Sequence, residues 1–178
     1  GTGKTFFTQC LAGELNRPLI MLNLAFLQAK ENPIQELNNI FEYLNNTNSK
    51  QLILIDEIEK MVGTGEDPLT GRLMTILSDL YSSAGEYKKL DVLILATANN
   101  LDSILKNQPA LLRRGRFDEL FFQNTPKTDE VEEYFNLYAK KYKLETALEM
   151  YGTTKLIKDI GKEYEEINPQ SKNFIYTP

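Results

Sequence analysis

Short apolar runs alternate with amphipathic segments over the first 125 residues. Residues 51–55 (QLILI) and 92–96 (VLILA) are continuously apolar, which is typical of strands buried on both faces of a parallel sheet. Residues 33–44 carry apolar side chains three and four positions apart, which predicts a helix that begins at Pro33. Further strands are expected at 18–24 and 120–122, and further helices at 6–15, 69–81 and 101–112, the last broken at Pro109. This alternation predicts βαβ units and an α/β fold with helices on both faces of the sheet.

From Pro126 onward the apolar strand pattern stops. Residues 128–142 have acidic residues in the first turn, lysines in the last and Thr128 as the expected N-cap, which predicts a helix. Residues 154–166 predict a further helix. We therefore expect an α/β domain over residues 1–125 and a helical domain over residues 126–178.

Composition narrows the chemistry. The net charge of −5 makes a nucleic-acid partner unlikely as the main function, because phosphate backbones are bound by basic surfaces. The absence of histidine excludes His-dependent nucleophilic catalysis and His-ligated metal sites. A single cysteine, Cys10, allows no internal disulfide and favours a reducing, cytoplasmic compartment. We expect no membrane segment in this chain, since no apolar run approaches about 18 residues.

Residues 1–5 read GTGKT, the second half of the phosphate-loop pattern G-x-x-x-x-G-K-[ST]. Glycines let main-chain N–H groups approach phosphate oxygens at the start of a helix. Lys4 would reach the β- and γ-phosphates and Thr5 would ligate Mg²⁺. The alternative is a Gly-rich tail with an accidental lysine. The first Gly of the pattern and its preceding strand would lie before residue 1, so we expect the chain to be truncated there.

Polar residues follow two of the predicted strands. Asp56 and Glu57 come directly after residues 51–55, which places them at the carboxyl edge of the sheet, where α/β folds bind ligands. Asp56 would hold Mg²⁺ and Glu57 would act as general base, unless the pair only ends a strand in a solvated loop. Asn99 follows residues 92–96 and could orient the attacking water, although an Asn pair after a strand is more often turn chemistry.

Three arginines lie within four positions at 113–116. A planar, permanently charged guanidinium suits the charge that develops on a transferring phosphoryl group. The alternative is a basic turn that pairs with Asp118 or Glu119, and surface ion pairs of that kind contribute little. The chemistry of these residues alone leaves both readings open.

The segments GTGKT, LILIDE, ATANN and LLRRGRFDE, in this order and at these separations, resemble the AAA subgroup of the AAA+ ATPases. The likeness covers about residues 1–142. It looks greatest to small soluble AAA proteins of plastid and cyanobacterial genomes and to the ATPase domain of AAA membrane proteases. The resemblance implies a P-loop NTPase core followed by part of a helical lid, truncated at both ends.

The resemblance also implies a role for each matched position. Asp56 and Glu57 match Walker B, Asn99 is similar to sensor 1, and the Walker A end is matched by Gly1, Thr2, Gly3, Lys4 and Thr5. Arg113 and Arg116 match the paired arginine fingers that act on the nucleotide of an adjacent subunit, whereas Arg114 has no implied role. ATP and Mg²⁺ are the implied cofactors, and the implied assembly is a homo-oligomeric ring, commonly a hexamer, in the cytoplasm or the plastid stroma.

Two departures from the family bear on function. Residues 26–33 lack the aromatic-apolar-Gly triplet of the pore loop that threads polypeptides, and the chain ends before the helix that carries sensor 2. The first expectation is an ATP-hydrolysing ring that remodels a protein partner. The alternatives are a nucleotide-dependent assembly switch or scaffold with little turnover and, with less support, a nucleic-acid motor or clamp-loader-like subunit.

Overall fold

The computed structural model describes residues 3–47, 49–61, 67–82, 84–87, 90–124 and 128–167. Its internal contacts divide the chain into two compact units. One unit comprises Lys4–Phe121, and the other comprises residues 1–3 together with residues 122–178. The boundary between the two units, at residues 121–122, is close to the boundary at 125–126 that the sequence suggests. The assignment of the two units as separate functional domains stays a prediction.

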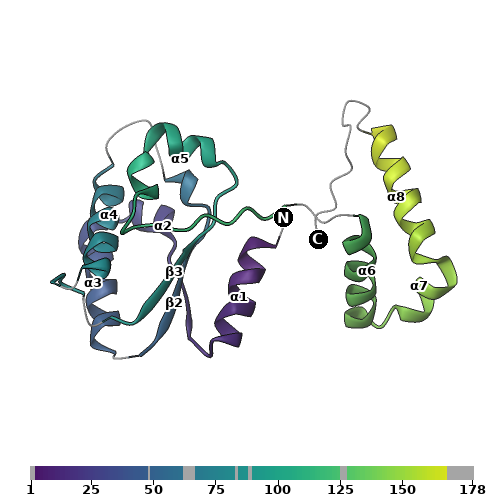
Figure 1. Cartoon of the computed structure of the whole chain (residues 1–178), viewed down its shortest axis with the longest axis horizontal. Coiled ribbons are helices and arrows are strands. Elements are labelled where there is room, and N and C mark those ends of the chain that lie inside the picture. Colours follow the sequence, from purple (N-terminus) through teal and green to yellow (C-terminus); the bar gives the residue numbers. More distant parts are fainter. Residues whose placement is uncertain are drawn as a thin grey trace. The chain divides into compact units, whose positions relative to one another are not determined.

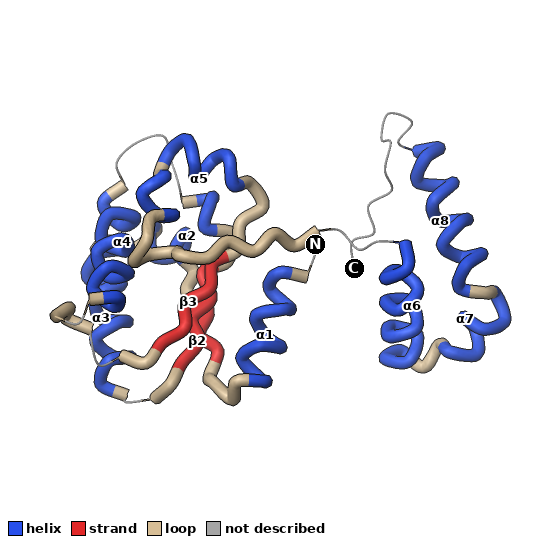
Figure 2. The backbone as a smooth tube through the Cα atoms, in the orientation of Figure 1, coloured by secondary structure: helices blue, strands red, loops and turns tan. Residues whose placement is uncertain are grey.

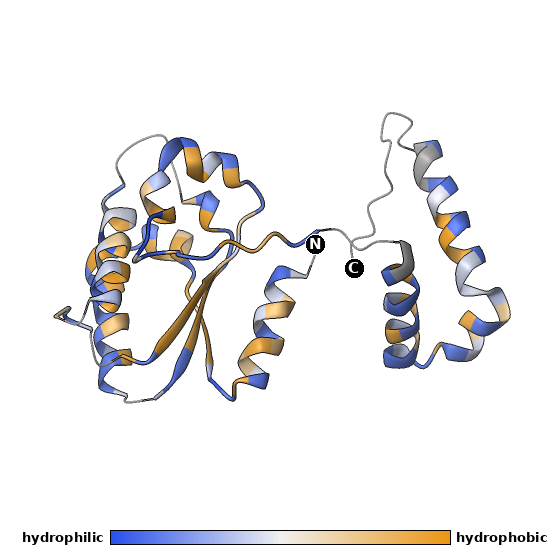
Figure 3. Cartoon of the chain, in the orientation of Figure 1, coloured by the Kyte–Doolittle hydropathy of each residue, from blue (hydrophilic) through white to orange (hydrophobic). Residues whose placement is uncertain are grey.

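The first unit is built on a parallel sheet with the strand order β1-β2-β3 (Figure 1). The strands are β1 (Leu19–Met21), β2 (Gln51–Ile55) and β3 (Val92–Ala96). In the register, Ile53 of β2 pairs with Ile20 on one side and Ile94 on the other. Every residue of the central strand is buried, and Figure 3 shows β2 and β3 as largely apolar segments. The predicted parallel sheet with apolar strands is confirmed.

Helices cover both faces of this sheet. Figure 2 shows α1 (Lys4–Glu14) on one side of the strands and α3 (Pro33–Asn46) and α4 (Pro68–Tyr81) on the other. The remaining helical segments of the unit are α2 (Leu24–Gln28), α5 (Leu101–Asn107) and two 3₁₀ turns, η1 (Ile58–Lys60) and η2 (Pro109–Leu112). As expected, the helix that begins near residue 101 is broken before Pro109. The predicted α/β class with helices on both faces is therefore confirmed.

Alternation along β2 divides the core between the two faces. Ile53 and Ile55 pack in a cluster with residues of α3 and α4, including Phe41 at 0% exposure. Leu52 and Leu54 point to the opposite face, where α1 contacts β2. Each such aliphatic side chain contributes roughly 1.5–3 kcal/mol when fully buried. The carboxyl ends of β2 and β3 are thus held by packing on both sides.

Two strand predictions need correction. The strand expected over residues 18–24 ends at Met21, because the Asn23 side chain accepts a hydrogen bond from the Phe26 N–H at 2.9 Å and caps α2. The strand expected over residues 120–122 is wrong, since this segment has no regular structure and Phe121 and Phe122 are each 88% exposed. A strand exists only by pairing, and no described strand pairs with this segment.

The described part of the second unit is helical. It consists of α6 (Thr128–Tyr142), α7 (Glu145–Tyr151) and α8 (Thr153–Ile167). The two long helices were predicted and the short α7 was not. The described residues buried in this unit are Val131, Ala139 and Ile157. The expected N-cap role of the Thr128 side chain lies outside what the structure describes. Within the described residues of the whole chain, no helix has the length and apolar character needed to cross a membrane.

Candidate nucleotide-binding site

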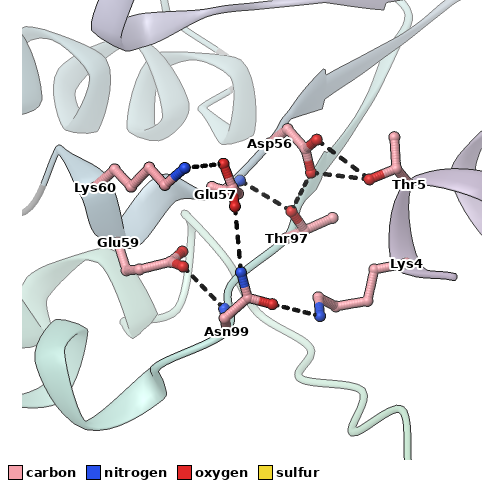
Figure 4. Close-up of polar contacts among 8 residues, drawn as sticks. All are labelled: Lys4, Thr5, Asp56, Glu57, Glu59, Lys60, Thr97 and Asn99. Carbon is pink, nitrogen blue, oxygen red and sulfur yellow. Dashed lines mark hydrogen bonds and ion pairs between the residues drawn. The ribbon is translucent and has the colours of Figure 1, made fainter. Parts of the chain in front are cut away.

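Polar side chains from three elements meet at the carboxyl edge of the sheet (Figure 4). Ile55 and Ala96 are paired at the ends of β2 and β3, so the residues that follow them emerge side by side. The ammonium of Lys4, at the start of α1, donates to Asn99 Oδ1 at 2.7 Å. The Thr5 hydroxyl donates to the Asp56 carboxylate. The structure thus brings Lys4, Thr5, Asp56 and Asn99 together at this edge.

The start of α1 is suited to an anion. Gly3 has φ +83°, a left-handed conformation that favours glycine, and it immediately precedes the helix. The first turn of α1 contains no acidic residue, and the N–H groups at the start of a helix carry the positive end of its dipole. Gly1 and Thr2, the other predicted phosphate-loop residues, lie outside the described residues.

Asp56 and Thr5 form an oxygen-rich pair. The Thr5 hydroxyl lies 3.2 Å from both carboxylate oxygens of Asp56, which is exposed. Among the described residues, no cluster of three or more Asp, Glu, Cys or His side chains could hold a metal ion alone. This donor set fits Mg²⁺, which takes oxygen ligands and commonly combines one or two protein groups with phosphate and water. Zn²⁺-type sites, which need several nitrogen or sulfur ligands, do not fit it.

Glu57 lies beside this pair with a backbone conformation that is uncommon for its residue type. Its φ of +52° and ψ of 50° are left-handed. One carboxylate oxygen accepts from Asn99 Nδ2 at 3.4 Å, and the other pairs with the Lys60 ammonium. The hydrogen bond from Lys60 to Glu57, together with the negative charge of Glu57, raises the pKa of Lys60 above its ordinary value. The Glu57 side chain is 40% exposed, so water can reach it.

Asn99 connects the groups of the site, whereas its neighbour Asn100 does not. The Asn99 amide accepts from Lys4 and donates to Glu57, and its main-chain N–H donates to Glu59 Oε1 at 3.1 Å. The Asn100 side chain instead accepts from the Ser103 N–H at 3.1 Å as the N-cap of α5. Of the two adjacent amides, the first belongs to the site and the second to local helix capping.

Sequence reasoning missed three residues of the network: Thr97, Glu59 and Lys60. The Thr97 hydroxyl donates to Asp56 Oδ1 and accepts from the Glu57 N–H. Glu59 fixes the Asn99 main chain, and Lys60 pairs with Glu57. Proximity to the Asp-Glu pair was the available signal for Glu59 and Lys60. Thr97 could have been suspected because it is the first residue after β3.

The arginine cluster is anchored differently at its two candidate positions. Arg116 is half-buried and donates to the Ala110 carbonyl at 2.7 Å and to the Ser78 hydroxyl at 3.2 Å. Arg113 is exposed. Asp118, the expected partner in the alternative reading, accepts a hydrogen bond from the Gly115 main chain at 2.6 Å. The hydrogen bonds of Arg116 thus go to its own turn and α4, away from the Asp56 network.

Residues 1–125 match the model of the ATPase family associated with various cellular activities (AAA). The chain belongs to the AAA family of ATPases. This family is a P-loop NTPase family, which agrees with the parallel sheet and with the location of the GKT segment at the start of α1. Lys4, Asp56 and Asn99 therefore lie together at the carboxyl edge of the sheet of an AAA domain.

The chain is similar to proteins of several kinds. It is 33% identical over 147 residues to the "uncharacterized AAA domain-containing protein ycf46" of Guillardia theta, covering 79% of this chain and 28% of that protein. It is 27% identical over 163 residues to the "ATP-dependent zinc metalloprotease FtsH" of Karelsulcia muelleri, covering 84% and 25%. It is 32% identical over 153 residues to the "proteasome-activating nucleotidase" of Sulfurisphaera tokodaii, covering 80% and 37%. The matched part is thus no more than 37% of any of these three relatives.

Proposed function

We propose that this AAA domain binds ATP with Mg²⁺ and hydrolyses it, and that in a homo-oligomeric ring it couples the turnover to remodelling of a protein partner. The hydrogen-bonded path from Lys4 through Asn99 to Glu57, beside the Thr5–Asp56 pair, is the observation that carries the proposal. Relatives named as a protease and as a proteasome-activating nucleotidase support a protein as the partner.

Each side chain has a distinct task in this proposal. Lys4 and the start of α1 bind the β- and γ-phosphates by charge and by main-chain N–H groups. Glu57 accepts a proton from the attacking water, and its partial exposure leaves room for that water. The Asn99 amide, which contacts both Lys4 and Glu57, holds the base and the phosphate-binding cation in one arrangement.

Thr5 and Asp56 would hold Mg²⁺ through their oxygens, directly or through water. The metal, when bound, neutralises charge that develops on the phosphate oxygens. The Thr5 hydroxyl faces both oxygens of Asp56 at 3.2 Å, so a small cation needs only modest rearrangement of these two side chains. Gly1 and Thr2 are proposed to continue the phosphate cradle.

A ring is proposed because of the two arginines. Arg113 is exposed, and Arg116 donates to its own turn and to α4. Within the part of the chain that the structure describes, no hydrogen bond links either arginine to Asp56 or Glu57. A guanidinium that an adjacent subunit supplies to the γ-phosphate increases turnover by about 10³–10⁵-fold in P-loop enzymes. Assembly would then be necessary for rapid hydrolysis.

Substitution of Glu57 by Gln in the complete protein tests the proposal. The amide keeps the shape of the side chain but cannot accept the proton, so ATP turnover should fall by about 10²–10⁴-fold while ATP affinity is retained. Glu36→Gln, on the exposed surface of α3, is the matched control and should leave both quantities unchanged. Turnover by Glu57→Gln at the control rate would remove Glu57 from the mechanism.

One observation favours a second function, a nucleotide-dependent assembly switch that turns over slowly. Lys60 holds an oxygen of Glu57, and this ion pair must be released before that oxygen can act as a base. Residues 26–33 also lack the pore-loop triplet. Sizing the complete protein with and without ATP, while steady-state hydrolysis is measured, separates the two functions. Rapid turnover stimulated by a protein substrate would contradict the switch.

A further inference from the structure

We propose that Thr97 is a positioning residue for ATP hydrolysis. Its single buried hydroxyl group orients both the Asp56 carboxylate and the Glu57 main chain. This inference rests on the proposed function and deepens it. The Thr97 hydroxyl donates to Asp56 Oδ1 and accepts the main-chain N–H of Glu57 at 2.9 Å (Figure 4). One side chain, directly after β3, thus contacts the metal-binding carboxylate and the backbone of the general base.

The main chain of Thr97 holds the same turn on both sides. Its N–H donates to the Ile55 carbonyl at 2.9 Å, just before the Asp-Glu pair. Its carbonyl accepts from the Ile58 N–H at 2.9 Å, just after the pair. The Asp56–Glu57 turn is therefore fastened at each end by the Thr97 backbone and in the middle by its hydroxyl.

The backbone conformation of Glu57 needs stabilisation of this kind. A non-glycine residue in the left-handed region is disfavoured by roughly 1–3 kcal/mol and persists only where its surroundings determine it. Glu57 adopts φ +52°, and the hydroxyl of Thr97 accepts the N–H of this same residue. The conformation directs the Glu57 side chain toward Asn99 and Lys60. Loss of the hydroxyl should therefore allow the Glu57 side chain to leave this orientation.

Burial makes the hydroxyl an effective constraint. Thr97 is 7% exposed, so water competes poorly for its hydrogen bonds. A hydroxyl has one proton to donate, and Thr97 commits it to Asp56. Among the described residues, the Thr5 hydroxyl also contacts Asp56, at 3.2 Å. The carboxylate is thereby oriented by the residue that follows β3, independently of α1.

Thr97→Val and Thr97→Ser in the complete protein test this assignment. Valine matches the shape of threonine without the hydroxyl, and serine keeps the hydroxyl. We expect Thr97→Val to lower kcat by about 10–100-fold, the usual effect of removing a group that orients a metal ligand. KM for ATP should change little, because Lys4 and α1 bind the phosphates. Thr97→Ser should restore kcat to near the wild-type value.

Controls separate positioning from folding. Thr75→Val removes a hydroxyl that donates to the Gly71 carbonyl within α4 and should leave kcat unchanged. Thr97→Ala also lacks the hydroxyl. Of Thr97→Val and Thr97→Ala, the variant whose melting temperature is closer to that of wild type is used to measure kcat. An unchanged kcat in that variant, or a Thr97→Ser variant as slow as it, would overturn the inference. If wild type itself does not hydrolyse ATP, the proposed function fails instead.

Discussion

The ammonium of Lys4 lies 2.7 Å from the side-chain oxygen of Asn99, although the two residues are 95 positions apart in the chain. The same amide donates from its nitrogen to Glu57. Asn99 therefore bridges the cation proposed to bind phosphate and the carboxylate proposed to activate water. Its side chain uses the acceptor and the donor of one amide for two groups of opposite charge.

Asn99→Ala should impair turnover without loss of stability. Removal of the amide removes the hydrogen bonds that link Lys4 to Glu57. We expect kcat to fall by about 10²–10³-fold, as for other polar groups that act in the transition state. The side chain is exposed, so the free energy of unfolding should change by no more than about 0.5 kcal/mol. Steady-state ATP hydrolysis and urea unfolding measure the two effects.

The adjacent Asn100→Ala variant is the control. Asn100 caps α5 through the Ser103 N–H, so its loss should cost about 0.5–2 kcal/mol of stability. Its turnover at a temperature where it stays folded should match wild type. If both variants show the same pattern, the division of the two amides between catalysis and capping is wrong.

Lys60→Met should raise kcat. Lys60 engages one oxygen of Glu57, and this contact must break before that oxygen can accept a proton from water. Lys60 is largely exposed and Glu57 is partly exposed, so the increase in kcat should be modest, up to about fivefold. Lys50→Met, a lysine exposed near Asp91, is the control for a lost surface charge. A large decrease in kcat with Lys60→Met would show instead that the lysine contributes directly to the reaction.

Arg113 and Arg116 should respond differently to substitution by Ala. Both changes should reduce ATP turnover if the arginines act across a subunit interface, by about 10³-fold or more. Only Arg116→Ala should also destabilise the fold, by about 1–3 kcal/mol, because it removes the hydrogen bonds that the half-buried guanidinium donates to the Ala110 carbonyl and the Ser78 hydroxyl. Turnover and thermal unfolding of each variant provide the comparison.

Mixing variants tests whether the arginine acts across the interface. Arg113→Ala subunits retain Glu57, and Glu57→Gln subunits retain Arg113. In a randomly mixed ring of equal amounts, about a quarter of the interfaces should combine both intact groups. Turnover should therefore exceed that of either variant alone. A mixture as inactive as its components would argue against a finger supplied in trans.

The sequence was sufficient for the parts of the fold set by local pattern. Pro33 and the apolar spacing after it identified α3, and the run from Leu52 to Ile55 identified a strand buried on both faces. The segment 120–122 failed because its apolar letters indicate burial but do not provide a pairing partner. The short α2 was missed because its start depends on a capping contact from Asn23.

The residues of the candidate site were likewise predictable from the sequence only in part. Lys4 was predicted from the phosphate-loop pattern and Asp56 from its place directly after a buried strand of a parallel sheet. Asn99 was predicted from its place after the next strand together with the resemblance to the AAA family. The contributions of Thr97 and Lys60 depend on side-chain distances within that edge. The left-handed backbone of Glu57 likewise has no signal in the sequence, because Glu is not a residue type that favours it.

Asp67, at the start of α4, should make the free energy of unfolding depend on pH. Its carboxylate accepts from the Thr70 N–H at 2.8 Å and from the Thr70 hydroxyl at 2.6 Å. Burial raises the pKa of Asp67, but the hydrogen bonds from Thr70 outweigh it, so the pKa lies below its ordinary value. A depressed pKa means that the folded state favours the ionised form. This stabilisation is present above about pH 4 and is lost as the pH falls through the lower pKa of the folded state.

Asp67→Ala should therefore lower the free energy of unfolding by about 0.5–2 kcal/mol at pH 7. Its difference from wild type should narrow as the pH falls below about 4. Asp67→Asn keeps a side-chain oxygen for the Thr70 N–H and should retain most of the stability at pH 7 without this pH dependence. Urea unfolding of the three proteins between pH 7 and pH 3 measures both effects. A difference between Asp67→Ala and wild type that stays constant down to pH 3 would show that the charge of Asp67 contributes nothing beyond its shape.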